Sequence, residues 1–427
     1  MKSFSFIHAS DLHLDSPFKG VTAQVPEIEG FLKSATFDAF DALVNLCIEK
    51  QVNFLLIAGD IYDASVRSLR SQLKFRDGVK KLTEHNIQTF VAHGNHDPLD
   101  GWSTTIQWPN RVHIFDANEV NRKTVTIDEE PVASVSGISY RRTKETRNLA
   151  AKFKATRPNL FQIGVLHCNC GSNPDHEVYA PCRLEDLTQT GFDYWALGHF
   201  HEKKVMSSNP YVVYPGNTQG LSIREAGARG CYLVRVSADH HVDMEFCELD
   251  AVRWLSGEIS IKDIGTLDSL DRSIAACIGD LNTRAEGRPA MSRITITGRG
   301  PLYRDLRREN TQNELLERAR QIGFDEDPIV WVQKLNINCR PEMNLERRRE
   351  MKDFVGQVLQ VSRDMYTEVQ QKKEEYDQLR DAFMPAFQDL YGHYRASKLL
   401  EALTPDTIMK ILEEAELLII DLLEADE

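Results

Sequence analysis

Residues 54–60 have the sequence Phe54-Leu55-Leu56-Ile57-Ala58-Gly59-Asp60, which joins a continuous apolar run to a glycine and then to a carboxylate. A short apolar run that ends at a turn residue predicts a buried β-strand. Gly59 lets the backbone turn tightly after this strand, and Asp60 then offers two oxygens that can bridge two cations. Because α/β sheets carry their ligand-binding loops at the ends of strands, the segment predicts an α/β domain with a functional site at this loop.

Four other strand candidates are followed closely by side chains that can bind a metal ion. They are Phe4–Ala9 before Asp11 and His13, Thr89–Ala92 before Asn95, Gln162–Leu166 before His167, and Tyr194–Leu197 before His199 and His201. In an extended chain, residues two positions apart point the same way, so the Asp-x-His and His-x-His pairs can each face one ion. Any one segment is weak evidence, because unrelated polar loop residues produce it by chance. All five in this order predict a metal centre.

The types of ligand indicate the metal and its use. Mixed nitrogen and oxygen ligands suit Mn²⁺, Fe or Zn better than Ca²⁺. We therefore expect two divalent cations, with Mn²⁺ as the first choice and Mg²⁺, Fe or Zn as alternatives. Two close cations can make a hydroxide at neutral pH and neutralise phosphate oxygens during an in-line attack. The sequence therefore predicts a two-metal phosphoesterase.

The pattern of apolar and polar residues divides the chain into three parts. Residues 1–250 alternate strand candidates with helical segments at 31–50 and 68–86, which predicts layered sheets flanked by helices. Residues 254–340 predict a second, smaller α+β unit. Residues 345–427 predict a helical tail, in which one long helix covers Leu345–Phe383 and Thr404 begins the last helix.

The composition of the chain indicates where the protein is located and what kind of surface it has. The net charge of −13 argues against a globally basic surface for nucleic acid, although a bound metal can carry positive charge to a phosphate. No apolar run reaches the roughly 20 residues that cross a bilayer. The N-terminus lacks the long apolar stretch of a signal peptide. We therefore expect a cytoplasmic protein without a membrane segment.

The cysteines offer a second candidate metal site. The chain has eight of them at scattered positions, which in a cytoplasmic protein predicts buried thiols rather than disulfides. Cys168, Cys170 and Cys182, with His176, could bind zinc. The regular spacing of a structural zinc site is absent, so buried thiols are the favoured interpretation.

The motifs Asp-x-His, Gly-Asp-x-x-Asp, Gly-Asn-His-Asp, a single His and Gly-His-x-His occur together in this order. In this the chain resembles the calcineurin-like metallophosphoesterases. The segments His8–Phe18, Gly94–Pro98 and Tyr214–Gly220 are similar to the SbcD-like DNA-repair exonucleases, particularly their YhaO-type branch. The resemblance covers residues 1–250 and extends to the small unit that follows. The tail resembles the family only in being helical. It implies a calcineurin-like layered β-sandwich flanked by helices, followed by a cap domain that helps to bind DNA.

The resemblance also implies roles for individual residues. One metal would be held by Asp11, His13 and His201, and the other by Asn95, His167 and His199, with Asp60 bridging both. His96 would protonate the leaving oxygen or stabilise the transition state, and Asp63 would orient it. In the cap, the candidates for contact with DNA are Arg304, Arg307 and Arg308.

Together these implications predict a metal-dependent DNA exonuclease or endonuclease that acts in DNA repair. The family implies an SbcC-like coiled-coil ATPase as partner, docked on the tail, and the alternative is a tail that packs on itself as a bundle. It also implies a homodimer paired through the helix at 68–86, and the alternative is that the apolar side of this helix only covers the sheet. One rival is a metallophosphoesterase of small nucleotides or cyclic nucleotides, and the cap and tail count against it. Another is a non-catalytic DNA-binding scaffold subunit, and the intact ligand set counts against that.

Overall fold

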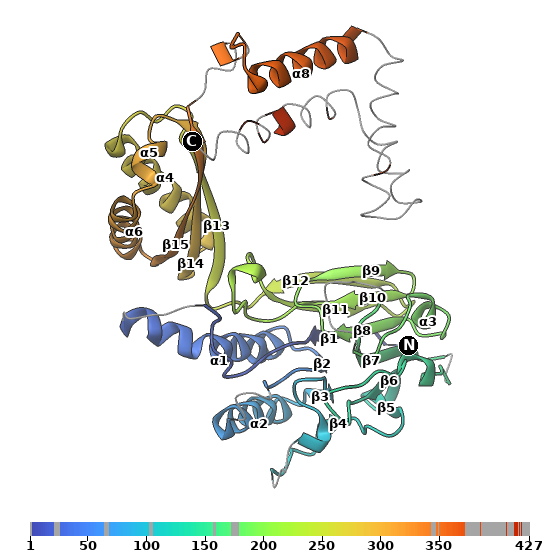
Figure 1. Cartoon of the computed structure of the whole chain (residues 1–427). Coiled ribbons are helices and arrows are strands. Elements are labelled where there is room, and N and C mark those ends of the chain that lie inside the picture. The colour runs from blue at the N-terminus through green and yellow to red at the C-terminus, as the bar shows by residue number, and fades with distance from the viewer. Residues whose placement is uncertain are drawn as a thin grey trace. The chain divides into compact units, whose positions relative to one another are not determined.

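A computed structural model of the chain describes residues 2–20, 26–63, 68–101, 106–156, 159–171, 179–342, 347–348 and 350–371, with 385, 407, 414–416, 418 and 420 beyond them. The chain forms two compact units (Figure 1). One comprises Met1–Glu258, Asp271–Thr295 and Asn313–Asn336, and the other Ile259–Leu270, Ile296–Gln312 and Ile337–Glu427. The domain boundaries expected from the sequence, 1–250, 254–340 and 345–427, stay predictions.

The first sheet has six strands in the order β12-β11-β1-β2-β3-β4. Its four parallel strands are β1 (Phe4–Ala9), β2 (Phe54–Ala58), β3 (Gln88–Ala92) and β4 (Val112–Ile114). The antiparallel side consists of β11 (Gly230–Val236) and β12 (Val242–Glu248). Because β1, β2 and β3 are parallel neighbours, the loops after them leave the sheet at the same edge.

The second sheet also has six strands, in the order β5-β6-β7-β8-β10-β9. Its parallel strands are β6 (Glu130–Ile138), β7 (Phe161–His167), β8 (Tyr194–Gly198) and β10 (Tyr211–Tyr214). Its antiparallel edges are β5 (Asn121–Ile127) and β9 (Lys204–Ser208). His167 lies opposite Gly198 in the register of β7 and β8, so these two strands end side by side.

The strand β2 shows how the layers are held together. Phe54 and Leu56 face a core shared with the second sheet, where they join Phe161 and Ile163 of β7. The alternate residues, Leu55 and Ile57, belong to a core with the helices α1 (Pro26–Glu49) and α2 (Leu69–Glu84). Burial on both faces explains why β2 is a continuous apolar run. The layered α/β fold flanked by helices that the sequence predicted is therefore confirmed (Figure 1).

The strands and helices expected within 254–340 are present. The three-stranded sheet β13-β14-β15 consists of β13 (Arg253–Ser260), β14 (Ala290–Gly300) and β15 (Val330–Pro341). Its helices are α4 (Leu267–Ala285), α5 (Tyr303–Leu306) and α6 (Glu309–Phe324). The first 258 residues add the short elements η1 (Leu99–Gly101), η2 (Ala150–Lys152), α3 (Glu185–Thr188) and η3 (Ile223–Glu225).

The long helix of the tail starts later than the sequence predicted. It was expected from Leu345, but α8 spans Phe354–Gln371. The carboxylate of Asp353 accepts the backbone N–H of Gly356 at 2.7 Å, which is the hydrogen bond of an N-terminal cap. The expected continuation from 372 to Phe383 lies outside the described residues. Of the helix expected from Thr404, only 407, 414–416, 418 and 420 are described, and these residues are helical. Among the helices of the described part, none is long and apolar enough to cross a bilayer.

Two helix glycines provide a test of how tightly the helices pack. A Cβ on Gly78 in α2 would lie 2.4 Å from the Phe40 ring of α1, whereas a Cβ on Gly279 in α4 would meet nothing within 4 Å. We expect Gly78→Ala to lower the free energy of unfolding by about 1–3 kcal/mol, because the buried ring has no room to move. Gly279→Ala should raise it by about 0.5–1 kcal/mol, because alanine favours the helix. Urea unfolding of both variants and the wild type measures these changes in the free energy of unfolding. If the two variants changed it in the same direction, the packing described here would be contradicted.

Candidate metal centre

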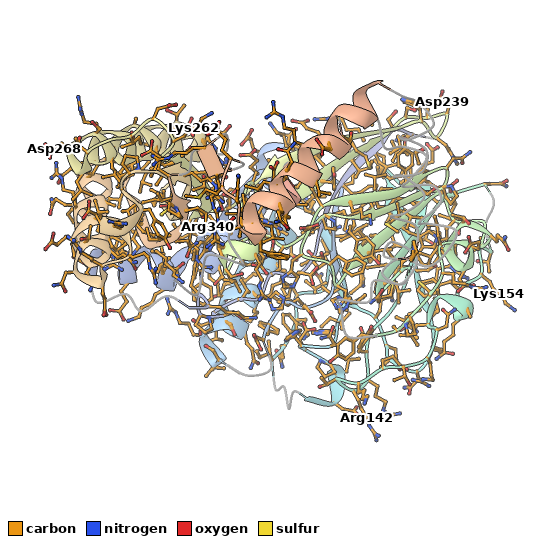
Figure 2. All side chains as sticks on the ribbon, turned by 45° about the horizontal axis from the view of Figure 1, so that its top comes forward. Arg142, Lys154, Asp239, Lys262, Asp268 and Arg340 are labelled. Carbon is orange, nitrogen blue, oxygen red and sulfur yellow. The ribbon has the colours of Figure 1, made fainter. Side chains whose placement is uncertain are left out.

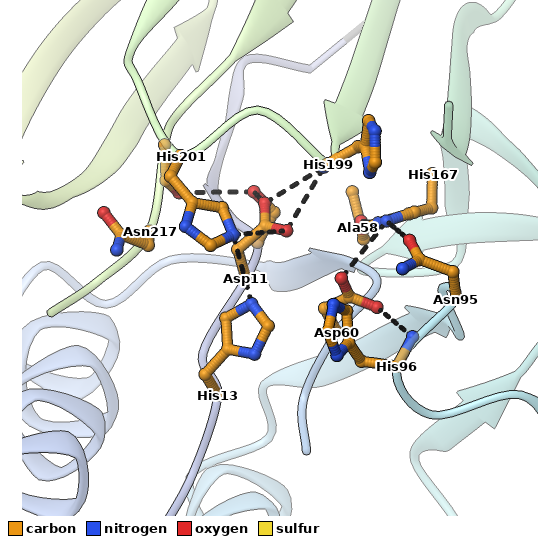
Figure 3. Close-up of polar contacts among 12 residues, drawn as sticks. Asp11, His13, Ala58, Asp60, Asn95, His96, His167, His199, His201 and Asn217 are labelled. Atoms are coloured by element: carbon orange, nitrogen blue, oxygen red, sulfur yellow. Dashed lines mark hydrogen bonds and ion pairs between the residues drawn. The ribbon is translucent and has the colours of Figure 1, made fainter. Parts of the chain in front are cut away.

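The seven predicted ligands converge where the two sheets present the ends of their parallel strands (Figure 3). They come from loops after β1, β2, β3 and β8 and from the last residue of β7, and are Asp11, His13, Asp60, Asn95, His167, His199 and His201. Asp11, Asp60 and His167 are almost completely buried. The fold therefore brings the predicted side chains together, while their binding of metal stays a prediction.

The first two loops are tied to each other through their backbones. The N–H of Asp11 donates to the carbonyl of Gly59 at 3.0 Å, and the N–H of His13 donates to the carbonyl of Asp60 at 3.1 Å. Asp11, His13 and Asp60 have φ values of 53°, 43° and 52°, in the left-handed region that non-glycine residues rarely adopt. Backbone strain of this kind clusters at functional sites, where the surrounding structure enforces it.

One group of ligands consists of Asp11, His13 and His201, whose ligand atoms all lie within 4.8 Å of one another. The Nε2 atoms of His13 and His201 are 3.2 Å apart, and Nε2 of His201 lies 4.0 Å from Oδ1 of Asp11. Two imidazole nitrogens at this distance cannot both carry a proton. A cation that both nitrogens coordinate fits the arrangement.

A second group surrounds His167. Its Nδ1 lies 2.9 Å from the carbonyl of Ala58, which can only accept, so Nδ1 carries the proton. The lone pair of a neutral ring is then on Nε2, which lies 2.9 Å from Oδ1 of Asn95 and 3.3 Å from Oδ2 of Asp60. Nε2 of His167, Oδ1 of Asn95 and Oδ2 of Asp60 are all hydrogen-bond acceptors in this state. Three acceptors can lie this close together only if a proton or a cation lies between them. This donor set fits a metal ion.

The charges of the site shift the pKa values of its groups in opposite directions. Burial raises the pKa of Asp11 to about 6, and burial together with the charge of His201 lowers the pKa of His13 to about 3. Burial alone would lower the pKa of His167, but the carboxylate of Asp60 outweighs it and raises that pKa to about 9. Burial would likewise raise the pKa of Asp60, and His167 outweighs it and lowers that pKa. Divalent cations are suited to neutralise such a buried cluster.

Asp60 lies at the centre of this arrangement. Its Oδ1 accepts the backbone N–H of His96 at 2.9 Å, while Oδ2 faces His167. A Cβ on Gly94 would lie 2.3 Å from Oδ1 of Asp60, and a Cβ on Gly59 would lie 2.2 Å from Nδ1 of His167. The two glycines are therefore required because the ligands approach the backbone so closely.

His199 is held at its backbone by the other buried carboxylate. Its N–H donates to Oδ1 and Oδ2 of Asp11 at 3.2 and 3.1 Å, and its φ is 106°. Its ring lies 5.2 Å from the ring of His167, centre to centre. The Gly-His-x-His loop of the second sheet is thus connected to the Asp-x-His loop of the first.

His96 and Asp63, the predicted catalytic pair, lie at the rim of the site. Nδ1 of His96 is 3.5 Å from Oδ1 of Asp63, and the His96 side chain is 42% exposed. The hydrogen bond with Asp63 raises the pKa of His96. Asp63, His96 and His13 also place one ligand atom each within 4.8 Å of the others. The exposure of His96 allows it to meet a substrate.

Two carboxylates that organise the site were not predicted from the sequence. Asp97 is fully buried and accepts the backbone N–H groups of Asp60, Ile61 and Gly94 at 3.2, 2.9 and 2.8 Å. Its place in the Gly-Asn-His-Asp motif was a signal for it. Glu225 on η3 lies 2.7 Å from Nδ1 of His201. Burial would raise the pKa of Glu225, but the hydrogen bond with His201 outweighs it and lowers that pKa to about 2.

The cysteine cluster does not resemble the metal centre. Sγ of Cys182 lies 3.8 Å from Sγ of Cys168, and Cys168, Cys170 and Cys182 are buried free thiols. Within the described ranges, no group of side chains placed to bind a metal includes a cysteine. His176, the fourth residue of the zinc interpretation, lies outside the described residues.

Two groups of arginines that could contact phosphates lie on the surface, one around Arg142 and the other in the predicted cap. Figure 2 shows Arg142 pointing away from the ribbon, and it pairs with Asp100 at 3.8 Å. In the other group, Arg308 pairs with Asp305 at 3.1 Å and Arg307 lies over the Tyr303 ring at 5.7 Å. Arg304 is exposed on α5. A role in binding DNA stays a prediction for these three arginines.

Comparison with known proteins relates the chain to phosphoesterases. The profile of the calcineurin-like phosphoesterases matches residues 4–203, and the profile of the middle domain of metallophosphoesterase YhaO matches residues 254–340. The uncharacterized metallophosphoesterase YhaO of Bacillus subtilis is 34% identical over 81% of this chain and 84% of that protein. The DNA double-strand break repair protein Mre11 of Thermoplasma acidophilum is 25% identical over 58% of this chain and 66% of that protein.

Asp97 provides a stability test of the site's framework. Asp97→Asn places an amide N–H₂ against backbone donors, so we expect the free energy of unfolding to fall by roughly 2–4 kcal/mol. Asp100→Asn is the matched control, because Asp100 pairs with Arg141 at the surface at 3.3 Å, and its change should stay within about 0.5 kcal/mol. Chemical unfolding of the metal-free variants measures both. Equal losses in the two variants would show that the buried carboxylate has no special role.

Proposed function

The chain belongs to the calcineurin-like metallophosphoesterase family, and from this we propose that it is a metal-dependent nuclease that hydrolyses DNA phosphodiester bonds. The observation that carries the proposal is the convergence of carboxylate, amide and imidazole groups around Asp60, from loops of both sheets. A binding scaffold has no use for such a set of buried, strained ligands. The intact site therefore favours an enzyme.

We propose that two divalent cations bind at this site. Asp11, His13 and His201 would hold one, Asn95, His167 and His199 the other, and Asp60 would bridge them. When bound, the cations supply positive charge to the phosphate oxygens and make water a nucleophile at neutral pH. The mixed nitrogen and oxygen ligands favour Mn²⁺.

His96 is proposed to act on the leaving oxygen. It is the most exposed histidine of the site, and Asp63 lies on the Nδ1 side of its ring. With Nδ1 oriented by Asp63, Nε2 is directed to the substrate and can donate a proton to the oxygen that leaves. Its backbone N–H meanwhile holds Asp60, so the loop positions a ligand and the proton donor together.

DNA as the substrate is supported by the relatives and by the parts beyond the site. Mre11 of Thermoplasma acidophilum bears the name of a DNA double-strand break repair protein, and the alignment includes 58% of this chain. Residues 254–340 match the middle domain of YhaO, a part that a small-nucleotide enzyme does not need. We propose that this part acts as the SbcD-like cap, with Arg304, Arg307 and Arg308 as phosphate contacts.

The proposed partners follow from exposed apolar side chains. Phe354 and Val361 of α8 are 66% and 58% exposed and lie seven residues apart, on one face of the helix. We propose that an SbcC-like coiled-coil ATPase covers this face of the tail. A homodimer would pair through α2, where Leu69 is exposed. The proposed setting is DNA repair in the cytoplasm.

The substrate is tested with DNA labelled at either the 5′ or the 3′ end, single- and double-stranded, under Mn²⁺, Mg²⁺ or a chelator. We expect degradation with Mn²⁺ and none with the chelator, because the buried ligands need cations to act on a phosphate. Activity confined to p-nitrophenyl phosphodiesters or cyclic nucleotides would instead identify an enzyme of small nucleotides. Binding of DNA without turnover of any substrate would identify a scaffold.

The role of His96 is tested by His96→Ala, which should lower kcat on DNA by about 10²–10⁴-fold because the leaving oxygen loses its acid. DNA affinity, measured by fluorescence anisotropy, should change less than about twofold, because the metal ligands and the DNA surface remain. His85→Ala is the control, since His85 is exposed at the end of α2 and contacts the carbonyl of Lys81. Turnover that survives in His96→Ala would remove this residue from the mechanism.

A further inference from the structure

We propose that Glu225 is a positioning residue that fixes the ring of His201 and thereby sets the affinity of the cation position formed by Asp11, His13 and His201. The inference rests on the two-metal site of the proposed function, but not on DNA as the substrate. Glu225 lies outside the motifs that supply the ligands, and its contact with His201 joins residues 24 positions apart.

The contact between Glu225 and His201 determines which ring nitrogen carries a proton. Oε1 of Glu225 lies 2.7 Å from Nδ1 of His201, and a carboxylate can only accept, so Nδ1 donates. The lone pair of the neutral ring is then on Nε2, the atom that faces Nε2 of His13 at 3.2 Å. Figure 3 shows the ring of His201 directed to His13 and Asp11. Glu225 thus presents His201 in the form that binds a cation.

Glu225 is itself held in place, so it can orient the ring. Its Oε2 accepts the N–H of Leu221 at 2.6 Å and an Nδ2 hydrogen of Asn217 at 3.1 Å. One carboxylate oxygen is therefore occupied by the loop and the other by His201. At the backbone, Glu225 donates to the carbonyl of Ser222 at 2.9 Å and accepts from Nε of Arg229 at 3.0 Å. The carboxylate cannot rotate away without breaking several of these bonds.

Arg229 connects the same loop to the backbone of His201. This buried guanidinium donates from Nη1 to the carbonyl of His201 and from Nη2 to the carbonyl of Ala226 at 3.1 Å. Its positive charge also lies close to Glu225, whose pKa it helps to lower. The loop therefore holds His201 at two places, the ring through Glu225 and the main chain through Arg229.

Two glycines allow the loop to come so close. A Cβ on Gly220 would lie 2.7 Å from the carbonyl oxygen of Glu225. Gly216 has a φ of 82°, and a Cβ there would lie 2.8 Å from the carbonyl oxygen of His201. Both obstacles are backbone atoms, which cannot rotate out of the way as a side chain can. The segment Gly216–Glu225 is thus shaped to support His201.

The two cation positions differ in the group that accepts a hydrogen bond from the imidazole ligand. His201 donates to a carboxylate, whereas His167 donates to the neutral carbonyl of Ala58. A carboxylate makes the imidazole a stronger ligand, and loss of such an outer partner typically weakens metal binding about 10–100-fold. The negative charge of Glu225 also adds to that of Asp11 on the same side. Removing Glu225 should therefore weaken one cation position and spare the other.

Titration of the full chain with Mn²⁺ by calorimetry, with elemental analysis of the loaded protein, tests the inference. We expect the wild type to bind two Mn²⁺ per chain and Glu225→Ala to bind one of them about 10–100-fold more weakly, with the other unchanged. Glu225→Gln keeps the size and an accepting oxygen, and should show a smaller loss. Glu202→Ala is the control, since Glu202 is exposed in the loop between β8 and β9, outside the segment Gly216–Glu225, and should match the wild type.

A His201→Ala background separates positioning from general support of the loop. If Glu225 acts through His201, Glu225→Ala should change Mn²⁺ affinity less than about twofold in that background. The same loss in both backgrounds, a loss at both cation positions together, or unchanged binding by Glu225→Ala would each overturn the inference. A wild type that takes up no Mn²⁺ would instead contradict the proposed function, so the two failures are distinguishable.

Discussion

The buried carboxylate of Asp60 needs other groups to neutralise its charge. It thereby connects the metal centre to both sheets of the sandwich. Asp60 follows β2 of the first sheet and is 1% exposed, and His167 reaches it from β7 of the second sheet at 3.3 Å. The same imidazole is bound to the carbonyl of Ala58 at the end of β2. Breaking such a buried pair leaves an uncompensated charge, which destabilises by several kcal/mol. The face-to-face packing of the sheets and the geometry of the site therefore depend on each other.

The loops that carry the predicted ligands are strained, and the strain falls on these polar residues rather than on the apolar residues of the same loops that pack in the core. Asp11, His13 and Asp60 each occupy the left-handed region, at a cost of about 1–3 kcal/mol per residue. Backbone hydrogen bonds between the two loops and the carboxylate of Asp97 hold them there. The apolar cores on both faces of β2 supply the stability that offsets this strain. Because these loops are held in place, their carboxylates and imidazole nitrogens can stay close together before any cation binds.

The parts of this arrangement that sequence predicts are those with local signals. The run before Gly59 predicts β2, and the motifs around Asp11, Asn95 and His199 predict ligands because each follows a strand end. The strained backbone has no such signal, because only a minority of Asp and His residues adopt positive φ and the sequence does not mark which ones. Glu225 could not be inferred, because its contact with His201 depends on how the loop after β10 folds back. The start of α8 had a signal in Asp353, but the amphipathic pattern continued upstream and concealed it.

Exposure within the site indicates how a phosphodiester approaches it. His167 and Asp60 form the buried floor of the site, the His201 side chain is 30% exposed, and His96 is the most exposed of its histidines. A phosphate must therefore enter from the side of His96 and His201, with the buried ligands beneath it. The proposed proton donor, His96, then lies at the rim, where the departing part of a substrate would extend into solvent. Such a layout offers one phosphate a place at the buried groups and leaves the rest of the substrate outside, which fits the proposed action on a phosphodiester. Under the proposed function, the part of the protein that recognises the rest of the substrate must lie beyond the predicted metal ligands.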